Sequence, residues 1–201
     1  MKVPSFVILA LSLIGCTGPN ETLDDADLLG GDVLVTTSLG QFVIALDRGN
    51  SPNTCENFLQ YVDSGFYDGT DEKGATVFHR VIDDFMIQGG GFTVDGTEKA
   101  TFDPIENESH INRLSNVRGT IAMARTSDPD SATSQFFINL LDNTYLDAGA
   151  IEDYGYTVFG TIDAGMDVID EIAVLETDEN DQPLEPVIIE SMTRIGNAPT
   201  E

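Results

Sequence analysis

The chain has 201 residues, of which 41% are hydrophobic, and this is enough for one domain with its own packed core. It carries 35 acidic and 9 basic residues, which gives a net charge of −26 at pH 7. This balance excludes binding to nucleic acid, which needs cations to neutralise phosphates, and it opposes docking of the domain on an anionic membrane surface.

The acidity itself has two interpretations. One is a well-solvated surface with no further meaning. The other is a high-salt habitat, because only three residues are lysine and dissolved salt screens the repulsion within so acidic a chain.

Residues 1–15 are predicted to be a lipoprotein signal peptide. Lys2 precedes an apolar run that is too short to remain in a bilayer as a spanning helix, and the run ends at Gly15 before Cys16. The ending LIGC resembles the lipobox of bacterial and some archaeal lipoproteins, which implies cleavage before Cys16 and lipidation of that cysteine. The alternative is an ordinary secreted protein with a chance cysteine. The lipoprotein prediction places the protein on a membrane, on its periplasmic or cell-surface side.

Residues 16–31 are predicted to be the lipidated cysteine and a flexible acidic tether, because the segment is polar and bounded by Gly and Pro. The globular domain is predicted over residues 32–196, and residues 197–201 form a short tail. If Cys16 is lipidated, Cys55 has no partner for a disulfide or for a cysteine metal site.

The domain begins with a β pattern. Residues 32–46 predict two strands with a turn between them. Residues 51–65 predict a helix that Ser51 caps, Pro52 opens and Gly65 ends. We therefore expect the helix to follow the first hairpin directly.

The buried face of this helix is predicted at Cys55, Phe58, Leu59 and Val62, which recur at helical spacing. Cys55 is accordingly interpreted as a small buried hydrophobe and not as a reactive thiol.

Six further segments have strand character, and their ranges are 76–82, 85–88, 119–124, 135–140, 156–162 and 187–195. A second helix is predicted over residues 163–175. Many short strands, few helices and Gly-rich turns favour a mainly antiparallel barrel or sandwich.

Several kinds of site have no support in the sequence. The glycine run after Gln88 lacks the lysine of a phosphate-binding loop, and no G-x-S-x-G motif marks a nucleophile. His79 and His110 are the only histidines and do not have the spacing of a metal site. No metal is predicted, and His79 is expected to be satisfied by a hydrogen bond.

Three motifs follow one another along the domain: FHRVIDDFMIQGGGF, RGTIAMARTSDPDSATSQFFINLLDNTYLD and YTVFGTIDAGMDVIDEI. Together they resemble the cyclophilins, in particular the bacterial cyclophilin-type peptidyl-prolyl cis–trans isomerases, over residues 32–195. The resemblance implies a closed, eight-stranded antiparallel β-barrel flanked by two helices. It implies an isomerase that needs no cofactor and acts on proline-containing polypeptides during the folding of exported proteins. We expect a monomer.

The resemblance makes Arg80 the catalytic residue. An X–Pro bond rotates slowly because amide resonance holds it planar, with a barrier of about 18–20 kcal/mol. Its rotation breaks no bond, so no nucleophile is needed. In the twisted state the imide nitrogen recovers its lone pair, and a fixed donor such as Arg80 stabilises that state more than the planar substrate.

The resemblance also assigns the groove that holds the substrate. It implies a proline pocket at Phe85, Met86, Phe137 and Leu146, and it implies that Gln88 binds the substrate carbonyl.

Positions for the residues before the proline are implied at Ala124, Arg125 and Gln135. By β alternation, Phe78 and Phe136 are expected to point away from this groove into the core.

The sequence departs from the eukaryotic pattern at four places. Tyr145 stands where those members often carry Trp, whose indole N–H binds the cyclic peptide cyclosporin. Tyr156 stands where many carry His, and Arg125 replaces a common Asn; bacterial members accept such variants, so both tyrosines are kept among the substrate-binding residues. Residues 71–75 resemble an insertion before the first motif.

A rival function is a proline-peptide-binding chaperone module whose isomerase activity is incidental. The presence of Arg80 argues against this alternative, because a module that only binds peptides would not need the donor.

Overall fold

The computed structural model describes residues 23, 28, 30–150 and 153–195. The predicted signal peptide, Cys16 and the predicted tail lie outside these residues. Within them, no helix combines the length and the apolar character needed to cross a membrane. The domain bounds and the lipid anchor therefore stay predictions.

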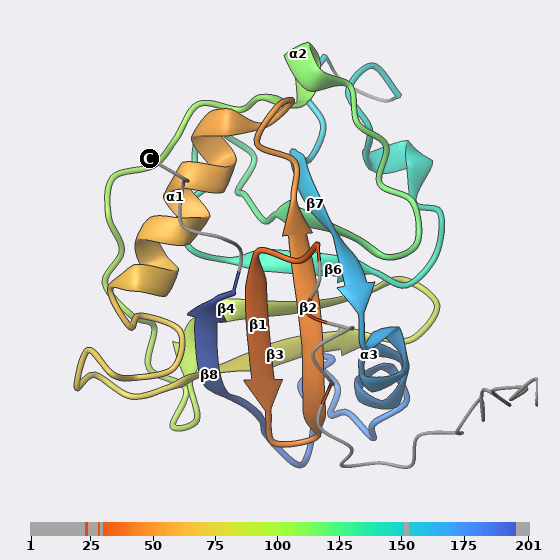
Figure 1. Ribbon diagram of the computed structural model, residues 1–201. Coiled ribbons are helices and arrows are strands. Elements are labelled where there is room, and N and C mark those ends of the chain that lie inside the picture. Colours follow the sequence, from red (N-terminus) through yellow and green to blue (C-terminus); the bar gives the residue numbers. More distant parts are fainter. Residues whose placement is uncertain (1–22, 24–27, 29, 151–152, 196–201) are drawn as a thin grey trace, which may run out of the picture.

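The domain consists of eight strands and a few short helices (Figure 1). The strands are β1 (Val33–Thr37), β2 (Gly40–Leu46), β3 (Thr76–Ile82), β4 (Met86–Thr93), β5 (Thr120–Met123), β6 (Phe136–Asn139), β7 (Val158–Ala164) and β8 (Val187–Arg194). The helices are α1 (Pro52–Asp63), α2 (Ser109–Asn112), the 3-10 helix η1 (Thr144–Leu146) and α3 (Met166–Ala173).

The strands close into one antiparallel barrel in the order β1-β2-β7-β5-β6-β4-β3-β8. Figure 1 shows the two longer helices, α1 and α3, on different sides of this barrel. The predicted fold class is confirmed, including both helices. The short α2 and η1 were not predicted, because a single turn leaves no periodic pattern to detect.

Strand β6 illustrates how the barrel creates two apolar regions. All four of its residues are buried, and its three apolar residues alternate between two clusters. Phe136 and Ile138 belong to the main core, whereas Phe137 belongs to a second cluster with Met86. The expectation that Phe78 and Phe136 point into the core is correct, since both are almost fully buried there.

Helix α1 starts where predicted but is capped by a different residue. The Ser51 hydroxyl makes no capping bond and instead donates to the carbonyl oxygen of Val158 at 2.7 Å. The carboxylate of Glu108 accepts the N–H groups of Asn53 and Thr54, at 3.1 and 2.9 Å. This buried carboxylate satisfies the free donors at the helix N-terminus and complements the helix dipole.

The predicted helix face is buried, and Cys55 is 2% exposed. Its Sγ donates to the carbonyl oxygen of Phe159 at 3.3 Å, and burial raises the pKa of the thiol to about 12. Cys55 is therefore a small core residue held in the unreactive thiol form, as the sequence predicts.

Strand β4 is longer than predicted because the glycine run continues the strand. Gly90 adopts a φ of +82°, and a Cβ there would lie 2.9 Å from the Phe136 ring. A Cβ at Gly91 would lie 2.6 Å from the side chain of Gln135. The glycines therefore let the side chains of Phe136 and Gln135 pack directly against the backbone. The run continues a strand and is not a phosphate-binding loop.

Residues 71–75, the predicted insertion, are fixed to the body of the domain by Lys99. This lysine has a side chain that is 2% exposed, and its Nζ donates to the carbonyl oxygens of Phe66 and Gly74 at 2.6 and 2.7 Å. It also pairs with Asp71 at 2.9 Å. The loop is thus an ordered part of the fold.

Candidate active site

A small cavity of about 150 Å³ lies on the outer face of the barrel. Its volume is below the roughly 300–1,000 Å³ of pockets for drug-sized ligands, so it suits a single small side chain or ring. It is lined by Arg80, Phe85, Met86, Gln88, Ala124, Arg125, Phe137, Leu146 and Tyr156. All of these residues belong to the groove predicted from the sequence, and none of them lies within residues 71–75.

Strand register brings the central residues together. Arg80 of β3 is paired with Gln88 of β4, and Gln88 is paired with Phe137 of β6. Because directly paired residues point to the same face of a sheet, the three side chains form a row across three neighbouring strands. A donor, an amide and an aromatic ring therefore face one cavity.

The floor of the cavity is the second apolar cluster. Met86 and Phe137 are 2% and 4% exposed, and Leu146 and Tyr156 pack against this cluster from the loops. The rings of Phe137 and Tyr156 meet edge to face, with centroids 5.6 Å apart. This floor can accept an apolar ring and exclude water from beneath it.

Arg80 stands at the rim of this floor with 42% of its side chain exposed. Its nearest charged partner is Asp181, whose Oδ2 lies 3.5 Å from Arg80 Nε. Asp181 comes from the segment between α3 and β8, about a hundred residues away along the chain, and was not predicted. Nothing in the local sequence pattern marks such a long-range contact.

Gln88 and Gln135 are linked by their side chains. The Gln88 Nε2 donates to Gln135 Oε1 at 2.8 Å, which orients the Gln88 amide at the cavity. Gln135 does not itself line the cavity, but the backbone at Gly91 leaves space for it. One N–H of the Gln88 amide remains available for a substrate carbonyl.

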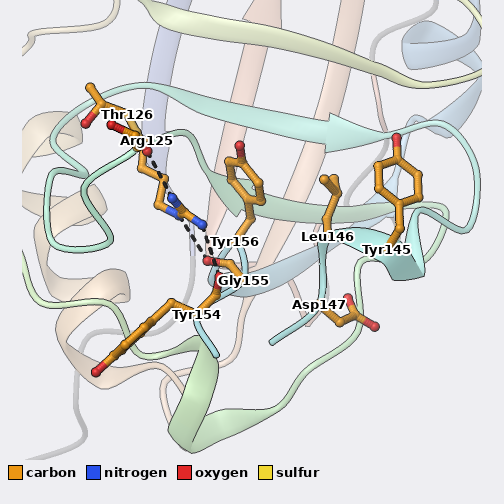
Figure 2. Close-up of a pocket in the computed structure, with 9 residues that line it drawn as sticks. Arg125, Thr126, Tyr145, Leu146, Asp147, Tyr154, Gly155 and Tyr156 are labelled. Carbon is orange, nitrogen blue, oxygen red and sulfur yellow. Dashed lines mark hydrogen bonds between the residues drawn. The ribbon is translucent and has the colours of Figure 1, made fainter. Parts of the chain in front are cut away.

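Arg125 and Tyr145 border a second, larger cavity of about 560 Å³ beside the first (Figure 2). Arg125 also lines the small cavity, so it stands between the two. The Tyr145 ring is 49% exposed and stacks on Phe85, with centroids 6.1 Å apart and planes 24° apart. The structure thus places Tyr145 at the edge of the small cavity and not within it.

His79 differs from expectation. Its Nδ1 is buried and makes no hydrogen bond within the part of the chain that the structure describes, so the expected hydrogen bond is not found at this atom. Its ring instead meets the edge of Phe92, with centroids 4.8 Å apart. Burial lowers the pKa of His79, because a cation there would lose its hydration. The neutral His79 ring is therefore accommodated by packing against Phe92.

Comparison with known proteins identifies the family. The sequence model described as cyclophilin type peptidyl-prolyl cis-trans isomerase/CLD matches residues 32–194. The chain is 50% identical over 163 residues to the peptidyl-prolyl cis-trans isomerase A of Dickeya dadantii, with 79% of this chain and 82% of that protein covered. It is 47% identical over 163 residues to the peptidyl-prolyl cis-trans isomerase B of Escherichia coli, with 78% and 95% covered.

Solved structures agree with these sequence matches. A crystal structure of a Cryptosporidium parvum cyclophilin type peptidyl-prolyl cis-trans isomerase, determined in the presence of the dipeptide Ala-Pro, superposes with a TM-score of 0.67 at 26% identity. The match covers 83% of this chain and 99% of that one. With the closed barrel and the family match over nearly the whole domain, this chain belongs to the cyclophilin-type peptidyl-prolyl cis–trans isomerases.

Proposed function

We propose that the cavity beneath Arg80 binds the proline ring of a polypeptide and that Arg80 accelerates rotation of the preceding X–Pro bond. The single observation that carries this proposal is the row of Arg80, Gln88 and Phe137 across three paired strands. This row places the guanidinium of Arg80 beside the apolar floor, with the free N–H of the Gln88 amide between them. The presence of Ala-Pro with the related Cryptosporidium parvum protein supports the same class of ligand.

The mechanism follows from what changes as the bond twists. The proline ring rests on Met86 and Phe137, and the Gln88 amide donates to the substrate carbonyl. In the twisted state the imide nitrogen becomes an acceptor, and an N–H of Arg80 donates to it. Because the donor acts more strongly on the twisted state than on either planar state, it lowers the barrier without forming a covalent bond.

The neighbouring groups support this role. The ion pair with Asp181 engages Arg80 Nε and leaves the terminal nitrogens for the substrate. A bound substrate covers the half-exposed guanidinium, and the loss of water strengthens its interaction with the nitrogen.

The cellular role is proposed from the N-terminal sequence. A signal peptide over residues 1–15 and lipidation of Cys16 would anchor the domain by an acidic tether outside the cytoplasmic membrane. There it would assist the folding of exported proteins that contain proline. Radiolabelled fatty acid should then enter the wild type and not Cys16→Ala, and an unlabelled wild type would contradict the anchor.

The rival role, a peptide-binding chaperone module, uses the same floor but does not need the arginine. Exchange NMR on an X–Pro peptide separates the two roles. We expect Arg80→Ala to lose most of the turnover while retaining the fold and much of the peptide affinity, and Arg80→Lys to recover little because it lacks the planar guanidinium. Unchanged turnover in Arg80→Ala would remove the mechanism and favour the binding module.

A further inference from the structure

Arg125 is held in place by the backbone around it. Its Nε donates to the carbonyl oxygen of Gly155 at 3.1 Å, Nη1 donates to that of Thr126 at 2.9 Å, and Nη2 donates to that of Tyr154 at 3.1 Å. The guanidinium also lies over the Tyr156 ring, 4.6 Å from its centroid. These contacts fix both the position and the plane of the cation, as Figure 2 shows for the hydrogen bonds.

The charge of Arg125 is not neutralised by these contacts. Five of the described cations form ion pairs with carboxylates: Arg48, Arg80, Lys99, Arg118 and Arg194. Arg125 makes no such pair within residues 30–150 and 153–195, although the chain has 35 acidic residues. Carbonyl oxygens orient the guanidinium, but they carry no net charge to offset its own.

Hydrogen-bonding capacity also remains. A guanidinium has five N–H donors, and three are used by the carbonyls, so two remain, one on each terminal nitrogen. The larger cavity contains a carboxylate of its own, Asp147, but this group accepts hydrogen bonds from Ser115 and Asn116. In Figure 2 its side chain points away from Arg125.

The position of Arg125 links it to the proline cavity. It lines both that cavity and the adjoining one of about 560 Å³, and Leu146 and Tyr156 are shared in the same way. A peptide whose proline occupies the small cavity therefore has its flanking residues within reach of the larger one.

We infer that Arg125 and the larger cavity form a specificity subsite for an acidic side chain on the residues that precede the substrate proline. This inference rests on the proposed function, which supplies the bound proline. A guanidinium that is held in a fixed orientation, keeps free N–H donors and has no carboxylate partner among the described residues is a suitable binding group for a carboxylate. The general field of the protein acts against this preference, because a net charge of −26 repels anionic peptides.

The test uses capped peptides of the form Xaa-Ala-Pro-Phe and Ala-Xaa-Pro-Phe, with Xaa either Glu or Gln. Exchange NMR gives kcat/KM, and titration gives Kd for the same peptides. We expect the wild type to favour Glu over Gln by about two- to tenfold at one of the two positions, and the preference to shrink in about 1 M NaCl. Arg125→Gln should abolish or invert the ratio, whereas Arg125→Lys should retain part of it.

Arg113→Gln is the matched control, because it removes the same charge from an exposed side chain that lines neither cavity. Its Glu-to-Gln ratio should equal that of the wild type. A wild-type ratio at or below one at both positions, or an equal preference in Arg125→Gln, would overturn the inference. Failure of the proposed isomerase activity would appear differently, as absent turnover of both peptides, and the Kd ratio would still decide the subsite.

Discussion

The Nε atom of Arg80 lies 3.5 Å from Oδ2 of Asp181, and the backbone carbonyl of Asp181 accepts the N–H of Val81 at 2.8 Å. The aspartate is thus attached to the strand that carries the arginine by two separate contacts. Both side chains are more than 40% exposed, at 42% and 43%, so the ion pair itself adds little to stability. We expect its effect to be on the orientation of Arg80.

Asp181→Asn should therefore reduce kcat/KM by about two- to fivefold while leaving the free energy of unfolding within about 0.5 kcal/mol. Asn is the suitable replacement because the residue has a φ of +62°, which Asn tolerates. Turnover of an uncharged X–Pro peptide should fall with added NaCl in the wild type but much less in the variant. A variant as active as the wild type at low salt would show that Asp181 does not position the arginine.

Lys99→Met should destabilise the protein by about 3 kcal/mol, since it breaks a buried ion pair and leaves two carbonyl oxygens without a donor. Urea unfolding measures this loss. Lys73→Met is the matched control, because Lys73 is exposed, belongs to the loop that Lys99 contacts and forms no ion pair with any described residue. Equal stability of the two variants would contradict the role assigned to Lys99.

The same ion pair predicts a dependence on pH. Burial alone would raise the pKa of Asp71, but hydrogen bonds from Lys99 and from the backbone of Lys73 bring it below its ordinary value of 3.8. The unfolded chain therefore binds the proton more readily than the folded protein does. The contribution of ionised Asp71 to the free energy of unfolding should be complete above the pKa that this group has in the unfolded chain. It should disappear as the pH falls through the lower pKa that the group has in the folded protein. Asp71→Asn should flatten this part of the stability profile, and an unchanged profile would argue against the pair.

Tyr145→Trp should tighten inhibition by cyclosporin by about two- to tenfold with little change in turnover. The family's tryptophan donates an indole N–H, and an ordinary hydrogen bond contributes about 0.5–1.5 kcal/mol. Tyr145 stacks on Phe85 and is half exposed, so its apolar contact is retained while its hydroxyl lies in another direction. Inhibition constants for the two proteins check this, and equal constants would refute it.

Added salt should raise the melting temperature. With a net charge of −26, screening removes repulsion from the folded state, and each kcal/mol gained raises the midpoint by about 2–4 °C for a chain of this size. The comparison is between low salt and about 1 M NaCl. A flat or falling midpoint would leave plain solvation of the surface as the explanation of the acidity.

Much of the fold could be predicted because its signals are local. The alternation at Phe136 and Phe137 separates core from groove, and a pattern of period two is visible in the sequence itself. The helix after residue 51 was likewise visible, but its cap was not. Glu108 lies 54 residues from Thr54, so no local pattern connects it with the helix. Ser51 stands in the usual capping position, and the sequence therefore predicts it as the cap.

The groove residues could be named only through the family motifs, and their contacts could not. The pairing of Arg80 with Asp181 and of Lys99 with Asp71 joins segments that come together only when the barrel closes. The three carbonyl oxygens around Arg125 are backbone atoms, which every residue possesses, so the sequence contains no residue type that predicts these contacts.

Closure of the barrel has a consequence for the proposed function, in which the substrates are unfolded chains. Among the described residues, the eight strands form a closed ring in which each strand has a neighbour on both sides, so the sheet has no free edge strand. An unfolded chain, which is rich in unpaired backbone groups, would find no edge strand to extend. Under the proposed function, a chain whose proline occupies the groove would therefore not meet a template for β aggregation and could dissociate after turnover.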